Sequence, residues 1–120
     1  MQVKLLKSKI HRAKVTDANL DYEGSIAIDS DLMKHANIQD YEKVHVLDIT
    51  NGARLETYAI PDTPGSKSIC INGAAAHLVK TGDRVIILSY CSIESSASNT
   101  HRPTIVRLNQ EIIKFDCLNL

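Results

Sequence analysis

The sequence has few aromatic residues and no excess of either charge. It contains no tryptophan, one phenylalanine and four tyrosines in 120 residues, and 14 basic side chains balance 14 acidic ones. A chain without net positive charge is poorly suited to bind nucleic acid or an anionic membrane. So few aromatic rings also leave little surface on which bases could stack. We therefore expect neither nucleic acid nor a membrane among its partners.

Long apolar runs and cysteine pairs are also missing. The longest aliphatic run, residues 85–88, is far shorter than a membrane span, and the basic amino terminus has no apolar core like that of a signal peptide. The three cysteines, Cys70, Cys91 and Cys117, are odd in number and widely spaced, which does not indicate a disulfide framework. We expect a reduced, cytoplasmic protein with one domain, residues 1–120.

Common catalytic and cofactor motifs are absent. The five histidines show neither His-x-x-x-His spacing nor a Cys-x-x-Cys partner, so no metal is expected. Phosphate-loop and dinucleotide fingerprints are missing as well. Cys70 and Cys91 lie in apolar segments, where an inert core thiol is more typical than a nucleophile.

The apolar pattern predicts a mainly β fold. Residues 3–16 alternate as a strand, which would place Lys9 and His11 on one face and Ser8 and Ile10 on the other. The segments "EKVHVLDIT" and "ARLETYAI" flank Asn51-Gly52, a pair typical of a type I′ hairpin turn. Further strands are predicted in "SIAID", "SICIN", "GDRVIILSYCSI" and "PTIVRLN". Residues 110–120 give no clear prediction.

Two short helices and an internal repeat complete the prediction. Residues 30–38 form one helix with Ser30 as its N-cap, and residues 73–79 form the other. After these helices, "IQDYEKVHVL" (38–47) and "VKTGDRVIIL" (79–88) share one pattern of aliphatic, acidic and basic positions. The repeat indicates two-fold pseudo-symmetry, although chance similarity of two strand starts remains an alternative.

The pair Gly24-Ser25 in "LDYEGSIAID" stands between two predicted strands and has two interpretations. One is an ordinary turn. The other is a peptide bond that cleaves itself, because a serine hydroxyl can attack the preceding carbonyl and turn the amide into an ester. Glycine leaves that approach open and adopts the strained backbone angles that such a step can need. Loss of the Ser25 α-proton would then expel the Gly24 carboxylate, and hydrolysis would leave a pyruvoyl group and ammonia.

A family resemblance favours cleavage. Residues 9–25 follow the pattern Lys-x-His-Arg-x-x-Val-Thr-x-Ala-x-Leu-x-Tyr-x-Gly-Ser, which resembles the processing region of the bacterial aspartate 1-decarboxylases. The segments "TNGARLETYAI" and "INGAAAHLVKTGDRVIILSY" are similar to two further blocks of that family, in the same order. Together the blocks cover residues 5–92, with a weaker match at "HRP" (101–103).

The resemblance implies a double-psi β-barrel and a homotetramer with active sites between subunits. It also implies cleavage after Gly24 into residues 1–24 and 25–120, with a covalent pyruvoyl group formed from Ser25. That carbonyl would form a Schiff base with L-aspartate and accept electrons as carbon dioxide leaves, giving β-alanine for pantothenate and coenzyme A. Some relatives mature with a helper protein, so spontaneous and assisted maturation both stay open.

The resemblance also assigns roles to single residues. Gly24, Ser25, Thr57 and Tyr22 would serve processing, with Tyr22 as an orienting residue. Tyr58 would be the proton donor and Arg54 the ligand of a substrate carboxylate, for which a guanidinium is suited. The other substrate-binding residues would be Lys9, His11, Thr57, Asn72, Gly73, Ala74 and Ala75, with Lys9 and His11 adding positive charge.

One conflict remains inside this assignment. In a regular strand Arg54 and Tyr58 share a face and Thr57 points the other way. A bulge, or a contribution of one face to a neighbouring subunit's site, would reconcile them. Two other functions stay open as well: a non-catalytic β-barrel for binding or assembly, and a pyruvoyl decarboxylase acting on another acidic amino acid.

Overall fold

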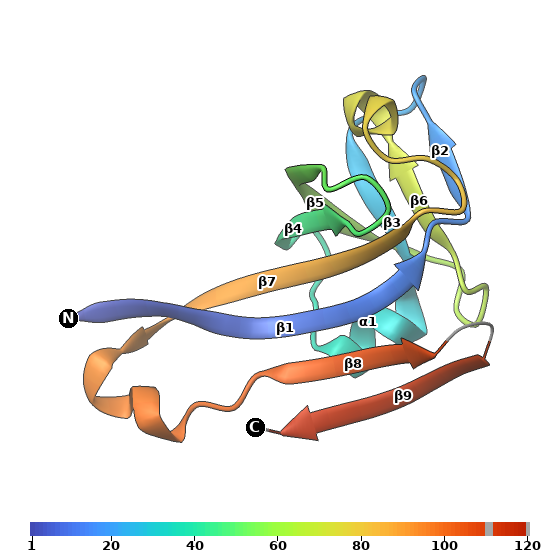
Figure 1. Ribbon diagram of the computed structural model, residues 1–120. Coiled ribbons are helices and arrows are strands. Elements are labelled where there is room, and N and C mark those ends of the chain that lie inside the picture. The colour runs from blue at the N-terminus through green and yellow to red at the C-terminus, as the bar shows by residue number, and fades with distance from the viewer. Residues whose placement is uncertain (110–111, 120) are drawn as a thin grey trace.

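The computed structural model describes residues 1–109 and 112–119, and over these the chain is mainly β, as predicted (Figure 1). The described strands are β1 (Gln2–Lys14), β2 (Asp17–Asn19), β3 (Ser25–Asp29), β4 (Lys43–Asp48), β5 (Arg54–Asp62), β6 (Ile69–Asn72), β7 (Arg84–Glu94), β8 (Thr104–Asn109) and β9 (Ile112–Asn119). The helices are α1 (Ser30–Ala36) and the short 3-10 helices η1 (Gly73–His77) and η2 (Ser95–Thr100). No helix among the described residues is long and apolar enough to cross a membrane.

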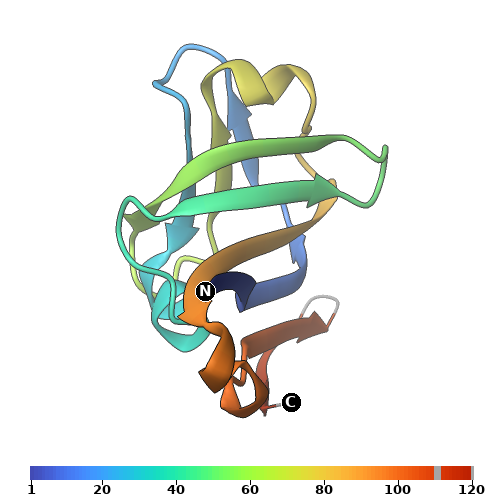
Figure 2. The same ribbon diagram turned by 90° about the vertical axis from the view of Figure 1, so that its left-hand side faces the viewer.

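The strands form one sheet in the order β2-β6-β3-β5-β4-β7-β1-β8-β9. β2 lies at one edge of the sheet and β1 lies near the other edge, yet only two residues connect them in the chain. Because so short a connection cannot span a flat sheet of this width, the sheet must curl. Figure 2 shows the strands curving around a common centre. β2 pairs in parallel with β6, and β3 with β5. These parallel pairs are compatible with the expected double-psi β-barrel, whose closure stays a prediction.

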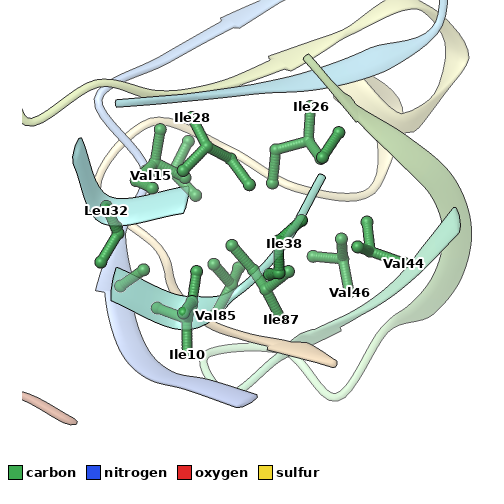
Figure 3. Close-up of a cluster of buried hydrophobic side chains, with 14 of the residues drawn as sticks. Ile10, Val15, Ile26, Ile28, Leu32, Ile38, Val44, Val46, Val85 and Ile87 are labelled. Atoms are coloured by element: carbon green, nitrogen blue, oxygen red, sulfur yellow. The ribbon is translucent and has the colours of Figure 1, made fainter. Parts of the chain in front are cut away.

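Branched aliphatic side chains from both halves of the chain fill the interior (Figure 3). In β1, Ser8 and Ile10 are fully buried whereas Lys9 and His11 are half-buried, which confirms the predicted alternation. All five residues of β3 are buried, because this strand lies between β5 and β6. Ser25, the first residue of β3, is thereby fixed to one of the most enclosed strands of the sheet.

The internal repeat is confirmed in the main chain. The two copies, residues 38–47 and 79–88, each lead through a turn into a strand, and these strands, β4 and β7, pair with each other antiparallel. Equivalent positions Tyr41 and Gly82 both have positive φ, at 68° and 92°. In each turn an acidic side chain accepts a backbone hydrogen bond, from Gln39 N to Glu42 Oε1 (2.9 Å) and from Lys80 N to Asp83 Oδ2 (3.0 Å).

Asp29, not Ser30, caps helix α1. Its Oδ1 accepts a hydrogen bond from Asp31 N at 2.9 Å. The same carboxylate accepts bonds from Gly65 N (3.1 Å) and Lys67 N (2.9 Å) in the loop between β5 and β6. Burial raises the pKa of Asp29, but these backbone donors outweigh burial and lower it below the usual value. The prediction of Ser30 was wrong because the sequence could not show that Asp29 also serves this distant loop.

The β4–β5 hairpin forms where predicted, but its turn is not type I′. Asp48 and Ala53 close a loop of the four residues between them, through Asp48 N to Ala53 O at 2.8 Å. Gly52 has a positive φ of 80°, whereas Asn51 does not, and a type I′ turn requires both. The buried carboxylate of Asp48 accepts from Thr50 N at 2.8 Å and Asn51 N at 3.3 Å, and this cap stabilises the longer loop.

Candidate active site

The Ser25 hydroxyl is buried and held by two hydrogen bonds. Ser25 is 4% exposed and pairs in register with Asn72 of the neighbouring antiparallel strand β6. Its Oγ accepts a hydrogen bond from Asn72 Nδ2 at 3.2 Å and donates one to the Glu23 carbonyl oxygen at 3.2 Å. The hydroxyl oxygen is therefore fixed within one residue of the Gly24 carbonyl that self-cleavage would attack.

Gly73 packs directly against the backbone before Ser25. A Cβ atom at Gly73 would lie 2.7 Å from Gly24 Cα and 2.8 Å from Gly24 N, closer than real Cβ contacts. Gly73 also has a φ of +78°, a region that favours glycine. Helix η1 thus begins in contact with the backbone of Gly24, and only glycine permits the approach.

Gly24 itself departs from one expectation. Its φ is not positive, so the left-handed strain that glycine could have accommodated is absent at this residue. A Cβ at Gly24 would have no atom within 4 Å apart from its chain neighbours. Gly24 therefore has open space on the side where a side chain would stand.

That opening belongs to a cavity of about 320 Å³. Its size is at the lower end for small-molecule sites, which suits a small metabolite. Its wall combines Gly24 just before β3, three successive residues of β5, the end of β6, and helix η1 with the residue that follows it. The lining residues are Gly24, Leu55, Glu56, Thr57, Asn72, Ala74, Ala75 and Leu78.

Strand β5 presents two different faces. Its pairing with β4 is continuous from Lys43↔Tyr58 to Leu47↔Arg54, without a bulge. Arg54 and Tyr58 are therefore exposed on the outer face, and Tyr58 is 37% exposed. Thr57 points the other way and lines the cavity. Of the two ways to reconcile these residues, the bulge is thus eliminated.

Lys9 and His11 lie on the outer face of β1. The in-register partners His11, Ile86, Leu47 and Arg54 form one row across four strands. Three strand spacings, roughly 14 Å, therefore separate His11 from Arg54. Burial lowers the pKa of His11. Nearby positive charges lower this pKa further, and the charge of Lys9 has the largest effect among them. His11 therefore contributes less positive charge than the sequence suggested.

Comparison with known proteins identifies the family. A model of the family described as aspartate decarboxylase matches residues 1–113. The aspartate 1-decarboxylase of Clostridium kluyveri is 54% identical over 110 residues, which cover 92% of this chain and 87% of the relative. The chain belongs to the aspartate decarboxylase family. The family's enzymes from Clostridium novyi (54% identity, 92% of this chain, 90% of the relative) and Caldicellulosiruptor saccharolyticus (53%, 95% and 91%) are similarly close.

The residues expected from the aspartate decarboxylase family divide into two groups. The first surrounds the Gly24–Ser25 bond and comprises Gly24, Ser25, Thr57, Asn72, Gly73, Ala74 and Ala75. The second lies on the outer face of the sheet and comprises Lys9, His11, Arg54 and Tyr58. Tyr22 is 62% exposed, and its carbonyl oxygen would lie 3.1 Å from a Cβ at Gly73. One chain brings the first group together but does not bring the second group to it.

Cys70 is a neighbour of the site that sequence reasoning missed. It is half-buried rather than a core residue, and its Sγ donates a hydrogen bond to Asn72 Oδ1 at 3.3 Å. Strand alternation was the available signal, because Cys70 lies two residues before Asn72 and so shares its face of β6. Among the described residues no group of three His, Cys, Asp or Glu side chains could hold a metal ion.

Proposed function

We propose that this protein is a pyruvoyl-dependent aspartate 1-decarboxylase, which converts L-aspartate to β-alanine and carbon dioxide for pantothenate and coenzyme A synthesis. The family assignment gives the reaction class. The observation that carries the proposal is the buried Ser25 hydroxyl, oriented by Asn72 beside a Gly24 that opens into a small cavity. We further propose that the protein works in the cytoplasm.

The proposed maturation cleaves the chain between Gly24 and Ser25. Ser25 Oγ bonds to the Gly24 carbonyl carbon, the peptide C–N bond breaks, and the hydroxyl proton passes to the released amine. Loss of the Ser25 α-proton then expels the Gly24 carboxylate from the resulting ester. Addition of water and release of ammonia convert the remaining dehydroalanine to a pyruvoyl group. Residues 1–24 and 25–120 become separate chains, with one water consumed and one ammonia released for the conversion of the ester.

The residues around Ser25 fit this chemistry. The hydrogen bond from Asn72 Nδ2 fixes Oγ, and the contact of Gly73 with Gly24 fixes the bond to be broken. Thr57 lines the same cavity and would donate a hydrogen bond to the oxygen of the attacked carbonyl. A pyruvoyl group at position 25 would supply an electrophilic carbonyl for the substrate amine and an electron sink for decarboxylation.

The remaining roles belong to substrate binding and proton transfer. Asn72 and the backbone of Ala74 and Ala75, which line the cavity, would contact the substrate, together with the backbone of the adjacent Gly73. Arg54 would bind a substrate carboxylate and Lys9 would add positive charge. Tyr58 would donate the proton that replaces the lost carboxylate.

We infer that the complete site lies between subunits of a homotetramer. Arg54 and Tyr58 point away from the cavity, and the regular pairing of β5 gives no bulge that could turn them inward. A second chain that presents its own outer face to the cavity would join the two groups. The functional site would then combine Ser25 of one chain with Arg54 and Tyr58 of another.

Turnover of defined substrates tests the proposed reaction. Purified protein is incubated with L-aspartate or L-glutamate, and released carbon dioxide and β-alanine are measured, with Ser25→Ala as the control. We expect turnover of aspartate that Ser25→Ala abolishes. Faster turnover of glutamate would mean another acidic substrate, and an inactive, uncut wild-type chain would favour a non-catalytic barrel or a requirement for a maturation helper.

Mixed oligomers test the shared site. Ser25→Ala chains and Tyr58→Phe chains are produced together with different tags, and oligomers containing both are isolated. If the site is shared, sites that pair Ser25 of one chain with Tyr58 of another regain activity. If each site lies within one chain, the mixed oligomers stay as inactive as either parent.

A further inference from the structure

A continuous chain of hydrogen bonds ends at the Ser25 hydroxyl. The Cys70 thiol donates to Asn72 Oδ1 at 3.3 Å, Asn72 Nδ2 donates to Ser25 Oγ at 3.2 Å, and Ser25 Oγ donates to Glu23 O at 3.2 Å. Every donor in this chain meets an acceptor. The four groups come from β6 and from the segment that runs into β3, two neighbours in the sheet.

The strand geometry places Cys70 at the start of this chain. Ile69 and Ile71 point into the core, at 2% and 0% exposure, so Cys70 and Asn72 share the opposite face of β6. Asn72 is 5% exposed, and a buried amide must find its partners within the protein. Cys70 supplies the partner on the oxygen side of that amide.

The thiol favours one of two amide orientations. Sulfur is a weak acceptor, so turning the amide by 180° would replace an S–H···O bond with a poorer N–H···S contact. The turned amide would also present Oδ1 to Ser25. The Ser25 hydroxyl would then donate its hydrogen bond to Asn72 Oδ1 instead of to Glu23 O. The orientation in the structure instead directs an N–H at Oγ and leaves the hydroxyl proton on the side of Glu23.

The charge state of the thiol agrees with a donor role. Burial raises the pKa of Cys70, and the negative charges of Asp17 and Asp62 raise it further. Asp17 is the in-register partner of Cys70 on β2. The thiol therefore keeps its proton at neutral pH.

We propose that Cys70 is a positioning residue for cleavage of the Gly24–Ser25 bond, whose thiol holds the Asn72 amide with Nδ2–H directed at Ser25 Oγ. This inference rests on the proposed self-cleavage. It assigns a role to a side chain that does not itself line the cavity and acts on Ser25 through Asn72. Removal of the donor allows the amide to turn, so a smaller fraction of chains holds Oγ in the reactive orientation.

The rate of maturation tests this role. Synthesis is stopped in cells that produce each variant, and the uncut fraction is followed over time by intact mass. Cys70→Val removes the hydrogen-bond donor at similar side-chain volume, and Cys70→Ser retains a donor. Cys91→Val is the control, because it changes another half-buried thiol, on β7 and outside the site, whose Sγ lies 3.7 Å from Leu5 O. We expect Cys70→Val to mature roughly three- to tenfold more slowly, corresponding to about 0.7 to 1.4 kcal/mol in the barrier.

The controls separate positioning from packing. Cys70→Ser should mature within about twofold of the wild type, and Cys91→Val at the wild-type rate. Equal slowing by Cys70→Val and Cys70→Ser would overturn the proposal, as would a wild-type rate for Cys70→Val. If melting shows that Cys70→Val does not fold, Cys70→Ala replaces it in the same comparison. A wild-type chain that is never cut would refute the proposed self-cleavage itself, and the role of Cys70 with it.

Discussion

Gly73→Ala is the substitution whose effect follows most directly from the structure. The new Cβ would lie 2.7 Å from Gly24 Cα and 2.8 Å from Gly24 N, so backbone must move on one side or the other. A non-glycine residue at the positive φ of Gly73 costs about 1 kcal/mol, and an overpacked methyl costs about 1 to 3 kcal/mol more. We expect the variant to lose about 2 to 4 kcal/mol of unfolding free energy.

The same displacement acts on the Gly24–Ser25 bond, where we propose that cleavage occurs. Misplacement of reacting groups by about 1 Å can reduce a rate roughly 100-fold, so a shift of several tenths of an ångström should slow cleavage at least about tenfold. Gly65→Ala is the matched control, because Gly65 has nearly the same φ, +75° against +78°, but open space around its Cβ position. It should lose only about 1 kcal/mol and cleave at the normal rate.

Two assays measure these effects separately. Urea unfolding is compared in a Ser25→Ala background, where every chain stays uncut, and maturation is followed by mass in chains that retain Ser25. If Gly73→Ala were no less stable than Gly65→Ala and matured as fast, the contact between Gly73 and Gly24 would not constrain the cleavage segment, and the reasoning would be wrong.

Three further predictions concern catalysis and stability. Tyr58→Phe should leave cleavage intact but reduce aspartate turnover roughly 100- to 10,000-fold, and near-normal turnover would remove Tyr58 from the role of proton donor. Asp29→Ala removes the cap of α1 and both bonds to the β5–β6 loop, so urea unfolding should show a loss of about 2 to 4 kcal/mol, and a loss below about 1 kcal/mol would contradict the structure. Lys7→Met removes the ammonium that lies 2.9 Å from the Glu42 carboxylate, where both side chains are 19% exposed. Burial raises the pKa of Glu42, but the Gln39 N–H and the Lys7 ammonium outweigh burial and lower this pKa. The pair therefore stabilises the fold at any pH above the pKa of an ordinary carboxyl, and this stabilisation is lost as acid protonates Glu42. The urea midpoint of Lys7→Met should therefore lie well below that of the wild type at pH 7 and approach it at about pH 3, whereas a gap independent of pH would refute this explanation.

Local chemistry made several elements predictable from sequence. Alternation in residues 3–16 correctly assigned the faces of β1, because Ser8 and Ile10 are buried while Lys9 and His11 are not. The family blocks led to the aspartate decarboxylase family, which the comparisons confirm. The sequence repeat of residues 38–47 and 79–88 corresponds to two turns of matching conformation in the structure.

The errors arose where one side chain serves distant segments. Asp29 caps α1 while it holds a loop more than 30 residues away, and nothing near Ser30 could reveal that competition. Asp48 stabilises a four-residue loop over the two-residue turn that Asn51-Gly52 suggested. β9 lies within residues 110–120, which gave no prediction, since its pairing with β8 is a tertiary contact.

The candidate site could be predicted only in part for the same reason. The sequence supplied Gly24, Ser25 and Asn72, but the contact of Gly73 with Gly24 joins segments almost 50 residues apart. The position of Cys70 beside Asn72 required the strand to be placed first. The two faces of β5 were foreseen, and the regular register now leaves a neighbouring subunit as the remaining way to bring Tyr58 to Ser25.

An intact mass spectrum of the purified protein under denaturing conditions shows whether the chain is cut after Gly24 and whether Ser25 has become a pyruvoyl group. We expect two chains, residues 1–24 and 25–120, whose summed mass nearly equals that of the uncut chain, because ammonia has been exchanged for water. A sum larger by one water would mean that the bond was hydrolysed and Ser25 remains serine. A single uncut chain in protein that decarboxylates aspartate would contradict the account outright.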